Sequence, residues 1–262
     1  MQQLLKRMAR AYPPRQLVPA LLVAAACSAA PAGAEDESVV IQLDLGSTWQ
    51  SRNKVQIPND NKGDKFSLED VAGDGPWAIV RAEGIWSINE KHGIRVLLAP
   101  FSYSENGKLD KQTRFAGATY SPDQNVKASY TFNTWRISYR YHLYAERDWD
   151  FWVGGTLLVR DAGIKLEQGD VSSQDDDVGA VPLLYLAGTY RLDKHWSINA
   201  DLDGLAGGPG RALDLGVRIN YQLDDKWQVG LGYRTLEGGA DTDDVYNFAW
   251  FNTVSVSASY RF

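Results

Sequence analysis

Cysteine, methionine, histidine and long apolar runs are scarce in this chain of 262 residues, which has 1 Cys, 2 Met and 3 His. Beyond residue 34 no apolar run is longer than about eight residues, whereas a helix that spans a membrane needs about 20. This excludes a helical membrane protein. A helical bundle is also disfavoured, because the 24 Gly, 9 Trp and 13 Tyr are poor helix formers and the aromatic residues favour strands.

The first 34 residues have the three parts of a secretory signal peptide. An apolar stretch over 17–30 is followed by Ala32, Gly33 and Ala34, whose small side chains suit a signal peptidase. The stretch is preceded by four basic residues, Lys6, Arg7, Arg10 and Arg15. We expect a signal peptide over 1–34 and a mature barrel over 35–262, whose net charge falls from −6 to −10 because those four residues are removed.

The single cysteine, Cys27, lies inside the apolar part of this segment. Cleavage after Ala34 leaves a mature chain without cysteine, which suits an oxidising compartment reached without disulfides. Lipidation of Cys27 as a new N-terminus is the alternative. It is disfavoured because an aliphatic residue larger than Ala24 is expected three positions before such a cysteine.

Apolar and polar residues alternate along the mature chain with a period of two. Within 212–223, Leu213 and Leu215 fall on one face, and Asp214 and Arg218 fall on the other. This pattern predicts strands with one apolar and one polar face. Ten such segments are expected, at 39–49, 77–88, 94–104, 128–144, 150–165, 180–192, 196–206, 211–223, 227–236 and 248–262.

Short and long connections alternate strictly between these segments. The short turns are 89–93, 145–149, 193–195 and 224–226, and the mostly longer, polar connections are 50–76, 105–127, 166–179, 207–210 and 237–247. All long connections therefore lie at one end of an up-and-down antiparallel barrel. Eight or twelve strands stay open as alternatives. Arg114–Tyr120 is a further strand-like stretch that extends a hairpin above the membrane or adds to the wall, which is why twelve stays open.

The C-terminal segment alternates in the same way and ends on an aromatic residue, Phe262. The other apolar positions, reading back, are Tyr260, Ala258, Val256 and Val254. This pattern resembles the C-terminal assembly signal of Gram-negative outer-membrane β-barrel proteins. The resemblance implies an all-β transmembrane barrel in the cell outer membrane, surrounded by lipid and lipopolysaccharide and inserted by the barrel-assembly machinery.

Physical chemistry supports the same placement, because lipid offers backbone groups no solvent and admits only helices or closed barrels. About 9 to 11 tilted strand residues cross the hydrocarbon core. Tryptophans near the segment ends match the aromatic girdles of such barrels, with Trp86, Trp149, Trp152, Trp196 and Trp227 by the short turns and Trp49, Trp77 and Trp250 by the long connections. A soluble barrel with an apolar core is the disfavoured alternative.

The polar face carries most of the charged residues, and it lines the lumen if the apolar face meets lipid. The expected lumen charge network consists of Arg81, Glu83, Arg136, Arg140, Asp201, Asp203, Asp214, Arg218 and Arg234, and Asp44 and Arg95 share this face. Ion pairing that stabilises the barrel, a constriction that selects solutes and a cation site are the alternatives. A narrow passage at most is expected, because eight strands already enclose a filled interior.

Folding 196–206 onto 211–223 places Asp203 opposite Asp214, and these carboxylates repel each other unless a cation lies between them. We expect Arg234, together with Arg211, to neutralise the pair. The same folding places Arg218 diagonal to Asp201. Folding the next hairpin about 224–226 places Arg234 diagonal to both Asp214 and Arg218.

Catalytic, cofactor and nucleic-acid functions find little support. His92, His142 and His195 lie in or near the short turns, so we expect no acid–base pair at the outer end, no enzyme activity, no cofactor and no bound metal. The negative charge disfavours nucleic acid. Acidic stretches at 175–177 and 241–244 leave weak divalent cation binding open beside ordinary solvated loop charge.

The sequence therefore predicts an outer-membrane barrel that is structural or forms a narrow, gated passage for small solutes. The alternative is a barrel that binds a surface partner, such as a host molecule, lipopolysaccharide or another protein, through the long connections 50–76 and 105–127.

Deleting Phe262 should sharply lower the yield of folded barrel, because the terminal aromatic residue is the element that the resemblance assigns to assembly. Heat-modifiable gel migration of membrane fractions measures that yield. Phe262→Tyr is the control and should assemble normally, and normal assembly of the deletion would contradict the assignment.

Overall fold

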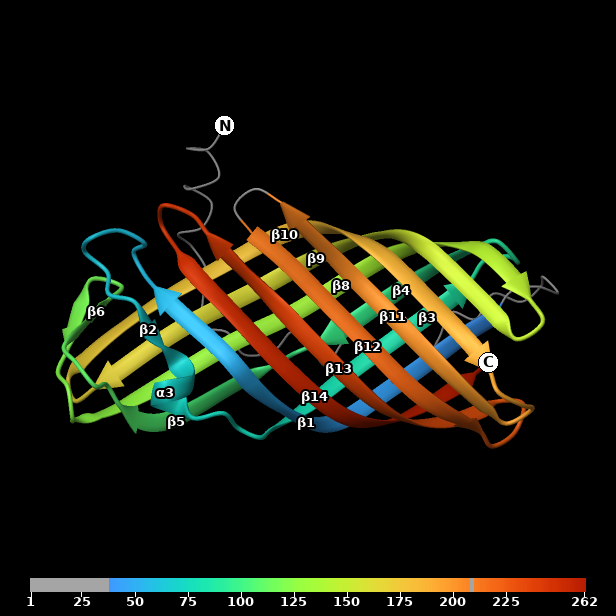
Figure 1. Ribbon diagram of the computed structural model, residues 1–262, viewed down its shortest axis with the longest axis horizontal. Helices are drawn as coiled ribbons and strands as arrows, with labels where there is room; N and C mark the ends of the chain where they lie inside the picture. Colours follow the sequence, from blue (N-terminus) through green and yellow to red (C-terminus); the bar gives the residue numbers. More distant parts are fainter. Residues whose placement is uncertain (1–37, 208–209) are drawn as a thin grey trace. The chain divides into compact units, whose positions relative to one another are not determined.

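The computed structural model describes residues 38–207 and 210–262, which belong to one compact unit, Asp36–Phe262, and are almost entirely strand (Figure 1). The expected signal peptide and Cys27 lie outside the described residues. The elements are β1 (Ser38–Gln56), β2 (Phe66–Ser67), α3 (Leu68–Ala72), β3 (Trp77–Ser87), β4 (His92–Ala99), β5 (Ser102–Lys108), β6 (Thr113–Phe115), β7 (Ala118–Tyr120), β8 (Asn125–Glu146), β9 (Trp149–Gln168), β10 (Val171–Arg191), β11 (Trp196–Gly207), β12 (Gly210–Gln222), β13 (Trp227–Asp241) and β14 (Tyr246–Arg261). Among them, no helix has the length and apolar character needed to cross a membrane.

The wall is a closed antiparallel barrel in which neighbouring strands along the chain pair with each other. Closure comes from β1 and β14, whose register runs from Val40 opposite Arg261 to Gln56 opposite Tyr246. Both β4 and β5 pair with β8, so they share one position in the wall. The wall therefore has ten strand positions, which confirms the expected fold and strand number.

Two short turns show how the sequence ends one strand and starts the next. Residues 192–196 and 223–227 both have the pattern Leu-Asp-x-x-Trp. The Asp193 carboxylate accepts hydrogen bonds from the backbone N–H groups of Trp196 and His195, at 2.8 and 2.7 Å, and these bonds lower its pKa. Asp224 does the same for Lys226 and Trp227, so each turn is closed by its own aspartate.

The outer face is apolar in the half of the barrel that carries the short turns, which we call the turn half. The side chains of Leu184, Leu231 and Ile137 are 63%, 55% and 53% exposed. A continuous band of such residues is unfavourable in water and favourable in lipid. Trp149, Trp196 and Trp227 lie at the short-turn edge of this band, as an aromatic girdle requires.

The polarity of the two faces inverts along the long strands. In the turn half of β8, Ile137 points outward and Arg136 is buried inside. In the other half of the same strand, which we call the mouth half, Lys127 points outward while Val126 and Ala128 are fully buried. The mouth half is therefore built like a water-soluble barrel, with its apolar residues inside.

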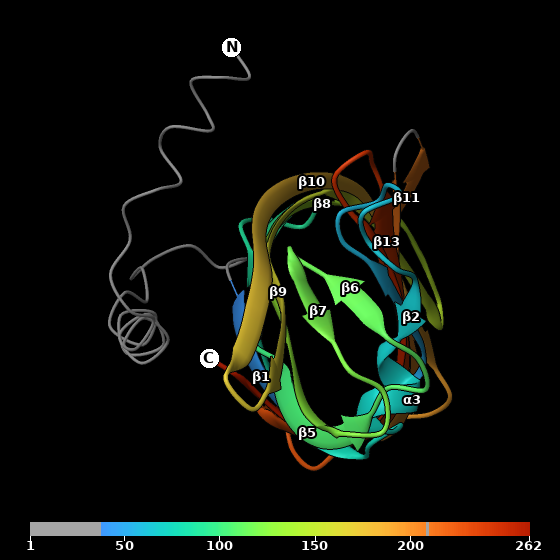
Figure 2. The ribbon, with the colours of Figure 1, turned by 90° about the vertical axis from the view of Figure 1, so that its left-hand side faces the viewer.

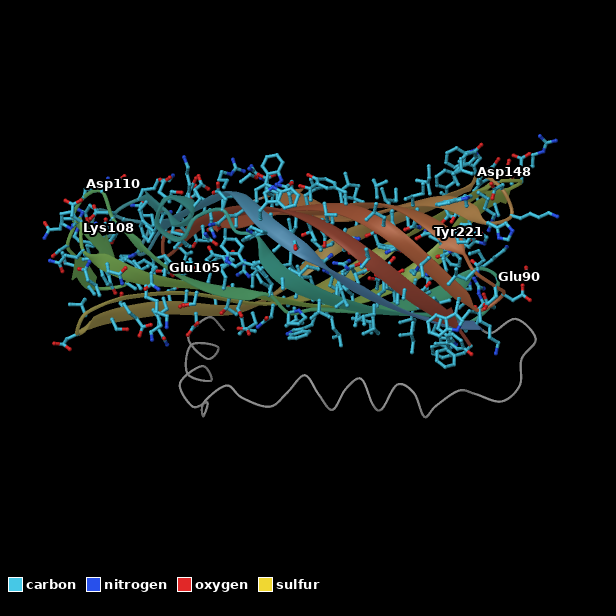
Figure 3. The ribbon with its side chains drawn as sticks, turned by 90° about the horizontal axis from the view of Figure 1, so that it is seen from below. Glu90, Glu105, Lys108, Asp110, Asp148 and Tyr221 are labelled. Carbon is cyan, nitrogen blue, oxygen red and sulfur yellow. The ribbon has the colours of Figure 1, made fainter. Side chains whose placement is uncertain are left out.

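Strand β9 shows the same inversion. Leu157 is outward and Thr156 inward in the turn half, whereas Lys165 is outward and Leu166 inward in the mouth half. Figure 3 shows Glu105, Lys108 and Asp110 at the mouth and Glu90 and Asp148 at the opposite end.

Several segments that were expected to be loops are largely strand, and this inversion of polarity is the reason. The segment 166–179 is a tight hairpin, since β9 ends at Gln168 and β10 begins at Val171. Parts of 50–76, 105–127 and 237–247 are also strand, because β1 reaches Gln56, β5 and β8 extend into the second connection and β13 reaches Asp241. The expected strands ended where outward apolar residues ended, but pairing continues with the apolar residues inside.

The stretch Arg114–Tyr120 forms a hairpin that is not one of the strands of the barrel wall. Strands β6 and β7 make a separate two-stranded sheet, and Ala116 and Gly117 between them have φ of 47° and 83°. Positive φ at both positions matches a type I′ turn. Figure 2 shows this hairpin across the opening at the mouth, so it closes the barrel without adding a strand to the wall.

The orientation of the barrel can be tested on intact cells. We expect Asp170→Cys, at the β9–β10 tip, to react with a maleimide too large to pass porins, because the mouth faces the medium. Asp225→Cys, in a short turn, should react only after the cells are broken. Labelling of Asp225→Cys on intact cells would reverse the orientation.

Candidate functional site

The mouth half of the lumen is filled by an apolar cluster. The β6–β7 hairpin supplies Phe115 and Tyr120, which are fully buried, and α3 supplies Leu68 and Val71. Helix α3 also supplies Ala72, and the connections after β1 and β5 supply Ile57 and Leu109. The wall supplies the remaining members, which are Val55, Tyr103, Val126, Ala128, Tyr130, Ile164, Leu166, Ala249 and Phe251. Burial of these side chains stabilises the closed mouth by the hydrophobic effect.

Hydrogen bonds tie the hairpin to β9. The Tyr120 hydroxyl donates to the Leu166 carbonyl oxygen at 2.9 Å. The Gln168 side-chain amide accepts from the Ser121 backbone N–H at 2.7 Å and donates to the Ser121 carbonyl oxygen at 2.9 Å. This side of the hairpin is therefore fixed to the wall.

The opposite side of the hairpin is held by the connection that follows β1. The Ala116 backbone N–H donates to the Ile57 carbonyl oxygen at 2.8 Å. The Arg114 guanidinium pairs with Asp64 at 2.8 Å, and this partner lowers the pKa of the Asp64 carboxyl to about 2. The hairpin is thus anchored on both sides of the opening.

An aromatic stack lies beneath the apolar cluster. The rings of Trp77 and Tyr103 are parallel within 6°, with centroids 4.0 Å apart, and the Trp77 indole N–H donates to Glu105 at 3.0 Å. Tyr103 donates to Gln50 at 3.0 Å. The expectation that Trp77 anchors the membrane interface is therefore wrong, because this side chain packs inside the lumen.

Charged side chains fill the turn half of the lumen. Six arginines and five carboxylates point inward, namely Arg81, Arg95, Arg136, Arg140, Arg218 and Arg234 with Asp44, Glu83, Asp201, Asp203 and Asp214. We call these residues the lumen charge network.

Arg136 lies between the two facing aspartates of this network. Asp203 is directly opposite Asp214 in the β11–β12 register. Arg136 contacts Asp203 at 2.7 Å through one terminal nitrogen and Asp214 at 2.6 Å through the other. Arg95 adds a second cation, 2.9 Å from Asp203 and 2.9 Å from Glu83.

Arg234 is diagonal to Asp214 and contacts it at 2.5 Å, while its other terminal nitrogen lies 2.8 Å from Asp201. A Cβ at Gly216 would overlap this guanidinium, so the glycine makes room for the ion pair. The alternating pattern counted Gly216 among the polar positions without revealing this steric role.

Two expected pairings differ in the structure. Arg211 lies on the outer face of β12, the face that carries Leu213, and pairs with Glu237 at 2.6 Å instead of with the Asp203–Asp214 pair. Arg218 is diagonal to Asp201 in the register, yet it pairs with Asp44 at 3.6 Å. Strand register could be inferred from the sequence, but the reach of a side chain across the lumen could not.

Arg140 interacts with aromatic rings. Its guanidinium lies 4.4 Å from the Trp152 ring centroid and 5.7 Å from that of Tyr185. Within residues 38–207 and 210–262, no carboxylate lies at salt-bridge distance from Arg140. Cation–π contacts therefore hold this member of the expected network.

The histidines lie at the turn end. His142 Nε2 is 3.1 Å from an Asp150 oxygen, and its ring stacks on Trp152 with centroids 4.5 Å apart. His92 contacts Tyr139, and His195 lies in the turn before β11.

Of the residues that the structure describes, no three or more His, Cys, Asp or Glu side chains are grouped to hold a metal ion. Weak divalent binding by the acidic segments stays a prediction.

Comparisons with known proteins identify the class of this fold. No protein-family model matches the chain, and no curated protein matches its sequence. The outer membrane protease OmpT from Escherichia coli is similar in structure, with a TM-score of 0.55 and 10% identity over 86% of this chain and 97% of that chain.

Two further solved structures are similar. The translocator domain of the autotransporter NalP from Neisseria meningitidis has a TM-score of 0.45 and 12% identity over 92% of each chain. Ail, the attachment invasion locus protein of Yersinia pestis, has a TM-score of 0.40 and 12% identity over 87% of this chain and 100% of that chain. The likeness to OmpT shows that the chain has the fold of an outer-membrane β-barrel.

Proposed function

We propose that this barrel is a closed, surface-exposed binding protein and not an open axial pore. The observation that carries the proposal is that the lumen is filled at two successive levels. The apolar cluster and the β6–β7 hairpin fill the mouth half, and the lumen charge network fills the turn half. A solute on the axis would have to displace both layers.

The mouth half supports a binding role because it is a rigid, polar structure. Strands β8, β9 and β10 have 22, 20 and 21 residues, about twice the 9 to 11 that cross the hydrocarbon core. Their outward residues in this half include Lys127 and Lys165, so the surface is solvated. Preformed strands lose less conformational entropy on binding than flexible loops do.

A narrow, gated passage is the second candidate, because the hairpin is not part of the wall. Its sheet contains β6 and β7 alone, and it is held by side-chain and backbone bonds that a conformational change can break. Swinging the hairpin aside would open the mouth half, and the lumen charge network would then decide which solutes pass.

An enzymatic role receives no support from the mouth. All three histidines of the chain lie toward the turn end, so a histidine-based acid–base pair is not available where external substrates arrive. The likeness to a protease concerns the fold alone. We therefore propose a non-enzymatic role.

Single-channel recording in planar bilayers tests the closed lumen. We expect the wild-type barrel to show no steady openings, because both layers block the axis. A variant in which residues 112–121 are replaced by a Gly/Ser linker should remain blocked by the lumen charge network. Steady wild-type openings would refute the proposal and favour the gated passage.

Binding is measured on the same wild-type protein in lipid discs, with lipopolysaccharide and host-cell surfaces as the probes. Binding that is lost in a variant with both Lys127→Glu and Lys165→Glu, which changes the outward surface of β8 and β9, supports the proposal. Absence of binding to both probes contradicts it.

Removing the central cation of the network should destabilise the barrel. Arg136→Ala leaves Asp203 and Asp214 facing each other, so we expect the free energy of unfolding to fall by about 3–5 kcal/mol, as for a broken buried ion pair. The urea unfolding midpoint measures this. Ile137→Ala, one residue on but facing lipid, is the control and should cost less, and equal effects would contradict a stabilising network.

A further inference from the structure

The wall of the barrel has a seam between β3 and β4 where two neighbouring strand positions are not hydrogen-bonded. The hydrogen-bonded ladder between β3 and β4 ends at the pair Ala82–Leu98, although β3 extends further toward the mouth as Trp77–Arg81. Strand β4 ends at Ala99, and Pro100 has no N–H to donate. Across the described part of the chain, no backbone hydrogen bond joins Trp77–Arg81 to the segment on this side.

This seam is short and is bounded at both ends. The β3–β4 hydrogen bonds bound it on the side of the short turns, and the stacked rings of Trp77 and Tyr103 bound it on the side of the mouth. Strand β5 does not fill it, because β5 pairs with β8. We call the opening the seam window, and its edges are Ile79, Val80, Arg81, Ala99, Pro100 and Phe101.

A cavity of about 100 Å³ lies behind the seam window. Its lining includes Val80, whose side chain is 40% exposed on the lipid-facing surface, and continues into the lumen to Arg218 and Arg234. These two arginines are paired there with Asp44 and Asp201, which also line the cavity, whereas Arg81 keeps a free donor. Ile79 and the rings of Phe101, Phe132 and Phe251 form an apolar part of the lining. The lining thus reaches from the lipid-facing strand position of Val80 through an apolar body to a charged inner end.

Arg81 at the inner end has an unused hydrogen-bond donor. The residue is only 7% exposed, and its Nη1 atom lies 3.4 Å from Asp214. Its Nη2 atom is buried and has no hydrogen-bond partner among the residues that the structure describes. A buried guanidinium N–H without an acceptor is costly, so this atom is a site for an acceptor that the chain does not supply.

The charge balance points to an acceptor with negative charge. Arg81 shares its carboxylate partner, Asp214, with Arg136 and Arg234, so three guanidinium groups contact one carboxylate. A planar carboxylate suits a guanidinium donor because it accepts short, charge-assisted hydrogen bonds.

We propose that the cavity binds a small amphiphilic monocarboxylate, of the class of short- and medium-chain fatty acids, that enters from the membrane through the seam window. The carboxylate accepts a hydrogen bond from Arg81 Nη2 and adds negative charge beside a guanidinium that shares Asp214 with two other arginines. The hydrocarbon part lies against Ile79 and the phenylalanine rings and extends toward lipid through the seam window. Entry by this route needs no open mouth.

Octanoate is the probe, and its binding is measured by NMR of the carbon-13-labelled acid with the full barrel in zwitterionic lipid discs. Wild type should bind octanoate saturably, and octanol, which lacks the charge, at least about tenfold more weakly. Arg81→Gln should weaken octanoate binding by a similar factor. Arg140→Gln is the matched control, since Arg140 is a buried lumen arginine outside the cavity lining, and it should bind as wild type does.

Ile79→Trp provides a second variant that leaves every charge in place and fills the apolar part of the cavity, so it should abolish saturable binding even if Arg81→Gln does not fold. Absence of saturable wild-type binding overturns the proposal. Binding of octanol as tight as that of octanoate, or unchanged octanoate binding by Ile79→Trp, also overturns it.

The entry route is tested by kinetics. Val80→Trp narrows the seam window on the lipid side and should slow octanoate association several-fold at unchanged equilibrium affinity. Val96→Trp, also lipid-facing but on β4 below the seam window, is the control. An unchanged association rate in Val80→Trp would refute entry through the seam window. Failure of these tests leaves the closed-lumen proposal standing, because conductance tests that separately.

Discussion

The structure depends on one constraint, which is that a strand in lipid has no solvent for its backbone polar groups. Pairing of β1 with β14 removes the last free edges and makes the wall a closed ring. Closure forces alternate side chains outward and inward, so an apolar outer face implies an enclosed polar inner face. The lumen charge network follows from this, because charges enclosed in a narrow lumen must find partners there.

The inversion of polarity along β8 and β9 divides the barrel into two chemically different halves. Where Ile137 and Leu157 point outward, the surroundings are lipid, and ion pairs occupy the inside. Where Lys127 and Lys165 point outward, the surroundings are water, and an apolar core occupies the inside. One continuous sheet therefore provides a membrane anchor and a rigid structure above it, and both halves of its interior are filled.

The seam beside Pro100 is a break in the pairing of the lipid-facing wall. Loss of ladder bonds in a lipid-facing wall is unfavourable, so a local reason for it is required. The proposed ligand gives such a reason. It would accept a hydrogen bond from the unpartnered Arg81 Nη2 and fill the cavity behind the seam, which has both apolar and charged lining residues. Binding through this side of the wall and closure along the axis are compatible properties of one barrel.

The sequence by itself determined the fold class, the ten strands and the short turns, because a period of two and the Leu-Asp-x-x-Trp turns are local patterns that tertiary contacts need not supply. It also determined which of Asp203, Asp214 and Arg234 share a face. Only the tertiary structure decided that Arg136, far along the chain, lies between the aspartates and that Arg218 pairs with Asp44. The polarity inversion also became visible only in the tertiary structure. A segment with polar outward residues is equally consistent with a loop and with a strand in water, and the buried core that includes Phe115 is what distinguishes the two.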